Sequence, residues 1–399
     1  MKKINLDISV NLKQGILDGY AYIELKKPAK YFILNKGLEV KYCNMEFSQK
    51  IVELTDFKKQ KVNFIKLEKT AENVEVKYSG TLESYEDVFP YLKDKINEEY
   101  TFLRTDTYFY PIFARPTSKD IINIIIKSNF DAEIIVSGIP SGYSVAFGGE
   151  IRGNNLRISN TWRLDIAIAK FSLVSHKDFR IFVLKGNEKY ARKTLKLIWD
   201  AFKFCCKMFG EKSVRYTVIE IPDGYGGQAG IGYSLVESKW FKSSIPYGIY
   251  HELAHFWNPK TEGEVQRTRF FDEAFANYIT ALIVKELYGE EEFKNVLEKF
   301  RKTFWQLVEK YPKGKDIPLV EYGKYELGIF SYTKGALILY ELHKLLGEKF
   351  YDLIRESCRR FGNKPIDFKS FEVLAEEISG KSLNKFFNEK IYGIWNPSR

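Results

Sequence analysis

With 399 residues, the chain is longer than one hydrophobic core usually serves, so its length predicts two domains. Hydrophobic residues make up 45% of it and charged residues 29%, which excludes an intrinsically disordered protein. The formal net charge is +10, but the lysines are spread along the chain without a basic run or a recognised binding motif. We therefore expect no nucleic-acid partner.

Cysteine usage and the apolar pattern predict where the protein is found. The four cysteines include one adjacent pair and no CxxC, so the sequence indicates neither a disulfide framework nor a thiolate metal site. The N-terminus lacks the unbroken apolar stretch of a secretory signal, and no apolar run of 18 residues occurs later. We expect a soluble, cytoplasmic protein without a membrane span.

The first part of the chain is predicted to consist of β-strands. Seven runs are rich in β-branched or aromatic residues and are separated by turn residues such as Gly153-Asn154-Asn155. They cover residues 20–25, 31–35, 74–80, 121–128, 132–138, 164–175 and 179–186. Residues 1–186 are therefore predicted to form an all-β domain.

From Asn187 onward the apolar residues recur at helical spacing, and this change marks the predicted domain boundary. A further strand is expected at residues 216–221, followed by a glycine-rich loop at 223–234. Helices are predicted near residues 246–257, 271–288, 290–311, 332–346, 348–361, 369–379 and 382–391. The sequence thus predicts an α+β protein in which residues 187–399 form a second, mainly helical domain.

The segment His251-Glu252-Leu253-Ala254-His255 is an HExxH motif. On a helix, this spacing places His251 and His255 one turn apart on the same face, where both imidazoles can bind one metal ion. The chain has only four histidines, so two of them at this spacing around a glutamate are an unusual coincidence. The alternative is a helix with two incidental histidines.

A third ligand is needed for zinc, and Glu273 is the favoured candidate. It lies eighteen positions after His255 in FFDEAFANYITALIV, a segment predicted to form a second apolar-faced helix. Two competing carboxylates are nearby: Glu264 lies in a polar connecting stretch, and Asp272 would point about 100° around the helix from Glu273. A His₂Glu set leaves one zinc position free for water, as catalytic sites require.

Two neighbours of these ligands have expected roles. Glu252 adjoins the first ligand and is placed to accept a proton from a zinc-activated water, which makes it the candidate general base. Asn277, one turn beyond Glu273, is a candidate hydrogen-bond partner for a ligand imidazole. Its alternative interpretation is an exposed helical asparagine.

HELAH, the downstream DEAFANY and then YTKGA at residues 332–336 make the chain similar to the aminopeptidase N-like zinc peptidases, a branch of the gluzincins. The resemblance covers nearly the whole chain. It implies a saddle-shaped β domain, which YTFLRTDTYFYPIF also resembles, followed by a thermolysin-like catalytic domain. In that family a tyrosine of a YxKG motif donates its hydroxyl to the oxyanion, and Tyr332 matches it. Without the HExxH motif, Tyr332 would be interpreted as a core residue at a helix start.

The chain departs from the family pattern in three places. The spacing from His255 to Glu273 is one residue shorter than the family norm, which a deletion in the polar connector TEGEVQRTR would explain. A C-terminal helical domain that caps the cleft in larger relatives is not matched, so we expect a more open groove unless a homo-oligomer or a partner chain completes it. HFWNPK at residues 255–260 also resembles glycyl aminopeptidases, more loosely.

The third departure concerns substrate binding. The family's GxMEN loop grips the free amino group of the substrate through its glutamate. The matching residues are expected to be Gly226, Gly227, Gln228, Ala229 and Gly230. Ala229 takes the place of the glutamate, although Glu220, Asp223 or Glu237 near the same loop would be possible replacements.

The sequence as a whole predicts a zinc metallopeptidase with one Zn²⁺ per chain and a peptide substrate. An aminopeptidase type is favoured by the resemblance. An endopeptidase or oligopeptidase that ignores the free N-terminus is the first alternative, because of Ala229. A catalytically weak peptide-binding scaffold is the second.

Overall fold

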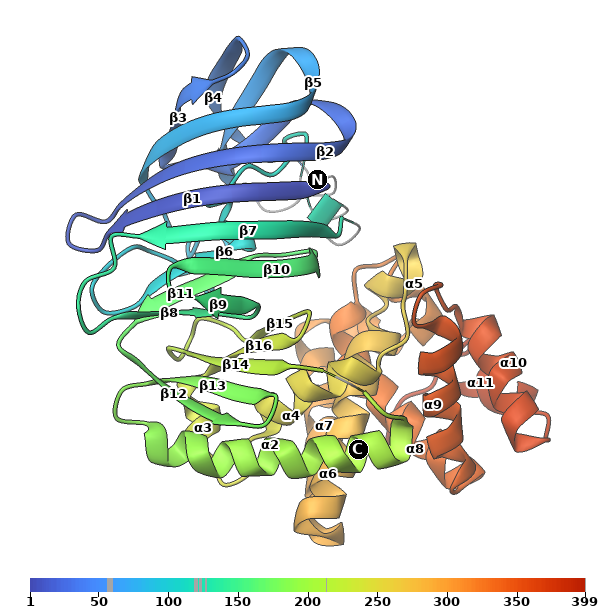
Figure 1. Cartoon of the computed structure of the whole chain (residues 1–399). Helices are drawn as coiled ribbons and strands as arrows, with labels where there is room; N and C mark the ends of the chain where they lie inside the picture. Colours follow the sequence, from blue (N-terminus) through green and yellow to red (C-terminus); the bar gives the residue numbers. More distant parts are fainter. Residues whose placement is uncertain (56–59, 118–120, 122–123, 126–127, 213, 399) are drawn as a thin grey trace. The chain divides into compact units, whose positions relative to one another are not determined.

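The computed structural model describes residues 1–55, 60–117, 121, 124–125, 128–212 and 214–398 (Figure 1). The chain divides into two compact units. Unit 1 comprises Met1–Leu195 and Val214–Ser243, and unit 2 comprises Lys196–Ser213 and Ser244–Arg399. The predicted domain boundary between residues 186 and 187 stays a proposal.

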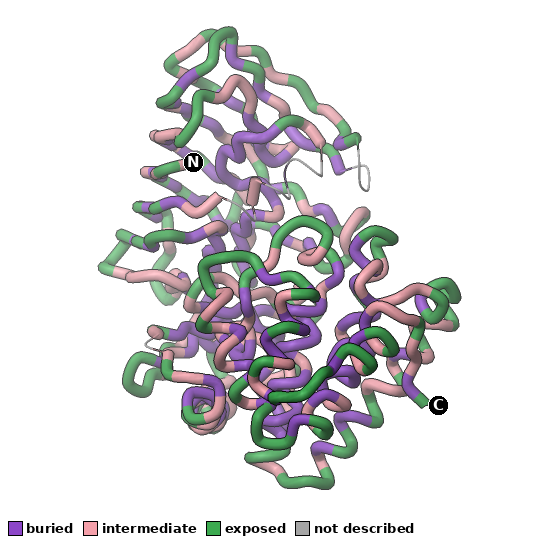
Figure 2. Tube along the Cα trace, turned by 90° about the vertical axis from the view of Figure 1, so that its right-hand side faces the viewer, coloured by how far each residue is buried: buried purple, intermediate pink, exposed green. Residues whose placement is uncertain are grey.

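A large sheet forms the first layer of unit 1. It is eight-stranded, with the strand order β3-β5-β2-β1-β7-β10-β9, and β4 also pairs with β5. Its strands are β1 (Lys3–Asn11), β2 (Ile16–Asn35), β3 (Leu38–Cys43), β4 (Phe47–Glu53), β5 (Lys61–Thr81), β7 (Phe130–Ser137), β9 (Glu150–Arg152) and β10 (Asn155–Thr161). Buried and exposed residues alternate strictly along β7, so one face of this strand supplies the core. Figure 2 marks the buried, intermediate and exposed residues along the trace.

Two smaller sheets complete the β structure of the described residues in unit 1. A three-stranded sheet has the order β6-β11-β8, and a five-stranded sheet has the order β12-β13-β14-β16-β15. The strands are β6 (Thr101–Arg104), β8 (Ser144–Phe147), β11 (Asp165–Ala169), β12 (Phe171–His176), β13 (Phe179–Leu184), β14 (Tyr216–Ile221), β15 (Gln228–Gly230) and β16 (Tyr233–Glu237). The core of unit 1 is apolar and aromatic, and the short helix α3 (Ser238–Lys242) follows β16.

Several strand predictions need correction. The runs at 20–25 and 31–35 belong to the single strand β2, which is irregular between Glu24 and Tyr31. The run at 164–175 is two strands of different sheets, β11 and β12. Strands β1, β3, β4, β8, β9 and β10 were not predicted, and β15 and the first two residues of β16 lie in the segment predicted as a loop. Glycines weaken the strand propensity of this segment, whereas pairing of β15 with β16 and of β16 with β14 stabilises both strands.

The predicted strand at 121–128 lies largely outside the described residues, since 122, 123, 126 and 127 are not described. The described Ile121, Ile124 and Ile125 are helical, so the strand prediction is wrong for these three. Their i, i+3, i+4 spacing is also the spacing of a helix face. A short apolar run cannot distinguish the two structures.

Unit 2 is mainly helical. The long helix α2 (Glu188–Phe209) begins in unit 1 and ends in unit 2. The other helices are α4 (Tyr247–Ala254), α5 (Gly263–Arg267), α6 (Phe275–Tyr288), α7 (Glu290–Lys310), α8 (Lys334–Leu346), α9 (Lys349–Phe361), α10 (Phe368–Ser379) and α11 (Asn384–Lys390). The predicted helices are confirmed within a few residues at each end, and so is the α+β class with a β-rich N-terminal part (Figure 1).

Helix α6 is the centre of unit 2. It packs against α4, α7 and α8, and nine of its residues are buried. At its N-terminal end, five phenylalanine rings contact one another: Phe270, Phe271, Phe275, Phe368 and Phe371. Large packed rings contribute much buried area and fixed geometry, so the start of α6 is held in place.

Two further predictions can be compared with the structure. All four cysteines are free thiols, as the absence of a disulfide framework predicted. Over the described ranges, each helix is either too short or too polar to traverse a lipid bilayer.

Candidate metal centre

The HExxH motif lies at the end of α4. His251 and Glu252 belong to this helix, and His255 begins the 3₁₀ turn η2 (His255–Trp257) that follows it. The opposite side of α4 is buried through Ile249, Leu253 and Ala254. The imidazoles of His251 and His255 therefore project from the same face, with ring centroids 4.8 Å apart and planes at 86°.

Glu273 joins the two histidines from a different element. It lies in a π-helical turn, η3 (Phe270–Ala274), which leads directly into α6. Its Oε2 is 2.9 Å from Nε2 of His251 and 3.8 Å from Nε2 of His255. The three ligand atoms all lie within 4.8 Å of one another, and Glu273 is buried.

The competing carboxylates are not part of this cluster. Asp272 Oδ2 lies 2.7 Å from Nε of Arg269, and its Oδ1 accepts a hydrogen bond from the backbone N–H of Glu273. Glu264 is exposed and pairs with Arg267. Among the described residues, His251, His255 and Glu273 form the group that can hold a metal ion.

The charges of the three side chains are strongly coupled. Burial alone would lower the pKa of His251, but the hydrogen bond and charge of Glu273 raise it to about 9. Burial and the charge of His251 lower the pKa of His255 to about 3. Burial alone would raise the pKa of Glu273, yet the hydrogen bond from His251 and the nearby cations hold that pKa well below its ordinary value. The surroundings of Glu273 thus favour a positive charge beside its carboxylate, as a metal ligand requires.

Asparagine side chains contact the outer nitrogen of each imidazole. Asn277 Oδ1 lies 2.7 Å from Nδ1 of His251, which is the kind of contact predicted for this residue. Asn258 Nδ2 lies 2.7 Å from Nδ1 of His255. Asn258 was not singled out from the sequence. Its position three residues after His255, within HFWNPK, was the available signal.

Asn277 also tests whether the site fits zinc. Coordination through Nε2 would leave a proton on Nδ1 of His251, and this proton needs an acceptor. Asn277 Oδ1, 2.7 Å from that nitrogen, is such an acceptor. Two imidazoles and a carboxylate whose ligand atoms lie within 4.8 Å of one another, with this acceptor behind His251, fit a His₂Glu zinc site.

Tyr332 lies beside the metal cluster. It ends the 3₁₀ turn η6 (Gly328–Tyr332), just before α8, and its ring is nearly parallel to that of His251, at 11° with centroids 6.4 Å apart. Burial and the charge of Glu273 raise the pKa of Tyr332 far above its ordinary value. Its hydroxyl, within hydrogen-bonding reach of Glu273, therefore stays protonated and able to donate.

Glu252 is half-buried next to His251, and its negative charge contributes to the raised pKa of that imidazole. The structure thus places the predicted ligands, the predicted base and the predicted tyrosine together in unit 2.

The predicted substrate loop belongs to unit 1. Residues 228–230 form β15, an edge strand that pairs only with β16 among the described strands. Gly226 has a φ of 69°, and its backbone N–H donates to Glu237 Oε1. Gln228 Oε1 accepts a hydrogen bond of 2.5 Å from Arg163. Because the metal cluster belongs to unit 2, a substrate-binding role of residues 226–230 stays a proposal.

The possible replacements for the missing acid already have partners inside unit 1. Glu220 is buried and accepts hydrogen bonds from Leu184, Asn187 and Ser238. Asp223 accepts from the backbone N–H of Lys239, and Glu237 accepts from the backbone of Gly224 and Gly226. Each carboxylate thus already accepts hydrogen bonds that stabilise the neighbouring backbone.

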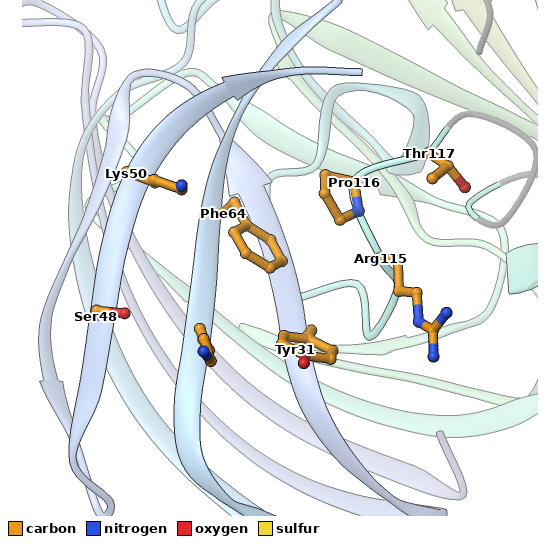
Figure 3. A pocket seen from close by; sticks show the side chains of 8 residues that line it. Tyr31, Ser48, Lys50, Phe64, Arg115, Pro116 and Thr117 are labelled. Carbon is orange, nitrogen blue, oxygen red and sulfur yellow. The ribbon is translucent and has the colours of Figure 1, made fainter. Parts of the chain in front are cut away.

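Unit 1 also has a hollow of about 670 Å³, which is a separate feature (Figure 3). Tyr31 and Phe64 stack at a centroid distance of 5.6 Å along its wall. Lys50 and Arg115 face it from different segments (Figure 3). The residues that line it include neither histidine nor carboxylate, so they do not form a metal site.

Comparisons with known proteins complete this description. No protein-family model matches the chain, and no curated protein matches it in sequence. Its fold is similar to that of yeast LTA4 hydrolase in complex with bestatin, with a TM-score of 0.71 and 15% identity over 100% of this chain and 68% of that one. An aminopeptidase N family protein from Idiomarina loihiensis gives 0.70 and 14%, over 99% and 77%. An M1 zinc metallopeptidase from Deinococcus radiodurans gives 0.62 and 15%, over 100% and 94%. The chain therefore has the fold of known zinc metallopeptidases.

Proposed function

We propose that this chain is a zinc metallopeptidase of the aminopeptidase N-like type that hydrolyses peptide bonds. His251, His255 and Glu273 would hold one Zn²⁺, with Glu252 as general base and Tyr332 as oxyanion donor. The observation that carries the proposal is the convergence of three ligand atoms within 4.8 Å, beside the half-buried Glu252 and Tyr332.

The chemistry of this site divides among its residues. A bound zinc ion supplies Lewis acidity, which polarises a carbonyl and acidifies water. Glu252 accepts the proton of the attacking water and passes it to the leaving amine. The Tyr332 hydroxyl, kept protonated by its surroundings, donates a hydrogen bond to the oxyanion of the tetrahedral intermediate. Asn277 orients His251 through its 2.7 Å contact with Nδ1.

An aminopeptidase type is supported by the proteins that share the fold. Two solved structures of Deinococcus radiodurans M1 zinc metallopeptidases contain a Tyr-Ser-Ala substrate and L-arginine, respectively. In this chain Gly226, Gly227, Gln228, Ala229 and Gly230 would bind the peptide backbone along the edge strand β15.

One observation favours an endopeptidase or oligopeptidase as the second candidate. Ala229 has no carboxylate, and the nearby acids Glu220, Asp223 and Glu237 already accept hydrogen bonds from the chain. A free substrate ammonium then lacks an obvious partner at this loop.

We further propose a cytoplasmic location, which agrees with four free thiols. A homo-oligomer or a partner chain remains part of the proposal as a possible wall of the substrate groove.

Metal analysis combined with a hydrolysis assay tests the proposed function. Purified protein should contain about one zinc per chain and cleave unstructured peptides. Glu252→Gln should keep the zinc and lose nearly all hydrolysis, whereas Glu264→Gln, which changes an exposed carboxylate, should behave like the parent. Peptide binding without cleavage by the zinc-loaded parent would favour a scaffold instead, and a protein that binds no zinc would refute the proposal.

A further inference from the structure

Arg269 has an unusual backbone conformation directly before the Glu273 turn. Its φ is 59° and its ψ is 23°, in the left-handed region that residues with side chains rarely occupy. The carbonyl oxygen of Arg269 then accepts hydrogen bonds from the N–H groups of Glu273 and Ala274, which begin the π-helical turn η3. A strained residue beside an unusual helical turn often marks a functional site.

Gly328 keeps this conformation in place. A Cβ atom at Gly328 would lie 2.5 Å from the carbonyl oxygen of Arg267 and 2.7 Å from Cγ of Arg269. The bare glycine therefore lets the segment before Tyr332 approach the backbone of Arg269 closely. Glycine or asparagine would adopt the left-handed conformation at position 269 with less strain. The presence of arginine there therefore indicates a role for its side chain.

That side chain reaches both carboxylates of the turn. Its Nη2 donates to Oε1 of Glu273, and its Nε lies 2.7 Å from Oδ2 of Asp272. The contact with Asp272 is an ion pair, because Nε has no partner at hydrogen-bond geometry. Asp272 in turn accepts the backbone N–H of Glu273 at 2.7 Å. Arg269 thus restrains the side chain of Glu273, and Asp272 restrains its backbone.

The two oxygens of Glu273 are consequently divided between two tasks. Oε1 is bound to Arg269, while Oε2 faces Nε2 of His251 at 2.9 Å and Nε2 of His255 at 3.8 Å. A carboxylate that is free to rotate can offer both oxygens to a metal ion. Here a planar guanidinium, whose shape matches a carboxylate, holds one of them away.

We propose that Arg269 is a positioning residue that makes Glu273 a one-oxygen ligand and so keeps a coordination position of the metal open. This inference rests on the proposed function and specifies how the site stays catalytic. Two imidazoles and one carboxylate oxygen leave room for water and substrate, whereas a second carboxylate oxygen would occupy that room. The positive charge of Arg269 also offsets part of the carboxylate charge, which leaves the bound metal a stronger Lewis acid.

The replacement Arg269→Gly separates positioning from folding. Glycine relaxes the left-handed backbone, which offsets part of the loss of the two ion pairs of Arg269, so the metal-free variant should still show a cooperative thermal transition. The matched control is Arg267→Ala, because Arg267 is exposed and its side chain pairs with the exposed Glu264 at 3.9 Å. Arg269→Asn provides a second variant that also tolerates this backbone conformation.

The test uses cobalt(II) in the zinc-stripped full chain and zinc affinity by competition with a chelator. The parent and Arg267→Ala should give the intense visible absorption of a cobalt site with few donors. Arg269→Gly and Arg269→Asn should give the weaker absorption of a higher coordination number, with one more oxygen in the X-ray absorption fine structure. Their zinc dissociation constants should fall about tenfold or more, because an additional carboxylate oxygen and the loss of a nearby positive charge both strengthen the binding of a cation.

The possible outcomes distinguish the two proposals. If Arg269→Gly and Arg269→Asn have the cobalt spectrum and the zinc affinity of the parent, the positioning role is overturned while the proposed function stands. If the parent itself binds neither zinc nor cobalt at this cluster, the proposed function fails first. A lower thermal midpoint of the metal-free Arg269→Gly, with an unchanged cobalt spectrum, would make Arg269 a structural residue only.

Discussion

Asn277 is hydrogen-bonded to Nδ1 of His251 through its side-chain oxygen, at 2.7 Å. The amide nitrogen of the same side chain donates to the backbone carbonyl of Tyr332 at 2.6 Å. One amide on α6 therefore fixes the tautomer of a proposed ligand and the backbone of the proposed oxyanion donor. This link follows from the fold, because α6 packs against both α4 and α8.

Replacing Asn277 by alanine should weaken zinc binding by His251 and remove the hydrogen bond to the backbone of Tyr332. We expect the zinc dissociation constant of Asn277→Ala to rise about 10- to 100-fold, since losing the partner of a ligand imidazole has that effect in other sites. Competition with a chelator measures it. Asn295→Ala on the exposed face of α7 is the control and should match the parent. Unchanged zinc affinity of Asn277→Ala would show that the contact does not orient His251.

The proposed ligand set can be tested by removing its members. His255→Ala and Glu273→Ala should each lose the zinc and keep the far-ultraviolet circular dichroism of the parent, because the packed phenylalanine rings at the start of α6 do not depend on the ligand atoms. Glu264→Ala serves as the control and should retain one zinc per chain. Full zinc content in either ligand variant would contradict the assignment.

Tyr332→Phe addresses the oxyanion donor. The variant should keep its zinc and its KM, while kcat should fall about 10²- to 10³-fold, the usual loss for one oxyanion-hole donor. Tyr325→Phe, at an exposed tyrosine, is the matched control. Cleavage by Tyr332→Phe at the rate of the parent would remove Tyr332 from the mechanism.

Lys334 follows the proposed oxyanion donor and predicts how stability depends on pH. Its side chain is fully buried, bonds to the Tyr322 hydroxyl at 3.0 Å, and has no carboxylate partner among the described residues. Burial lowers the pKa of Lys334 from 10.5 to about 8. Between these pH values the unfolded chain binds more protons than the folded one, so this group makes the protein more stable as the pH rises from 8 toward 10.5.

Lys334→Met should therefore be more stable than the parent at pH 7, by up to about 3 kcal/mol, and this advantage should shrink by pH 10. Urea unfolding of the zinc-loaded proteins at both pH values measures the difference. Lys344→Met, at an exposed lysine of the same helix, should show no such dependence. A difference between Lys334→Met and the parent that stays constant from pH 7 to pH 10 would mean that Lys334 is not destabilised by its buried charge.

The sequence predicted the helices of the site well because their signals are local. HELAH and FFDEAFANY have apolar residues at helical spacing, and both segments are helical in the structure. The roles of Arg269 and Asn258 were not predicted. Arg269 acts through a left-handed backbone that depends on the approach of Gly328, some 60 positions away, and no local pattern encodes such an approach.

The β structure was predicted less completely, and the reason is also physical. Strands β15 and β16 are short, and they are stabilised because β15 pairs with β16 and β16 pairs in parallel with β14. Such pairing is non-local, so strand propensity alone assigns these residues to a loop. At Ile121, Ile124 and Ile125, the apolar residues satisfied both a strand and a helix pattern.

The last prediction concerns which end of a peptide the enzyme recognises, and Ala229 decides it. A carboxylate that pairs with a buried ammonium contributes about 1.5 to 3 kcal/mol, which favours a free amino terminus roughly ten- to hundredfold. Ala229 offers no carboxylate, and Glu220, Asp223 and Glu237 are held by internal hydrogen bonds. We therefore expect slow release of single N-terminal residues from aminoacyl reporters.

Matched free and N-acetylated peptides measure this preference through kcat/KM. The ratio should be below about tenfold for the parent. Ala229→Glu restores an acid at the family position, and it should raise the ratio if residues 226–230 bind the substrate terminus. The control is Ser137→Glu at the exposed end of β7 in unit 1, which should leave the ratio unchanged. Discrimination above about hundredfold by the parent would mean that another acid anchors the amino group, and the aminopeptidase proposal would then hold without the loop glutamate.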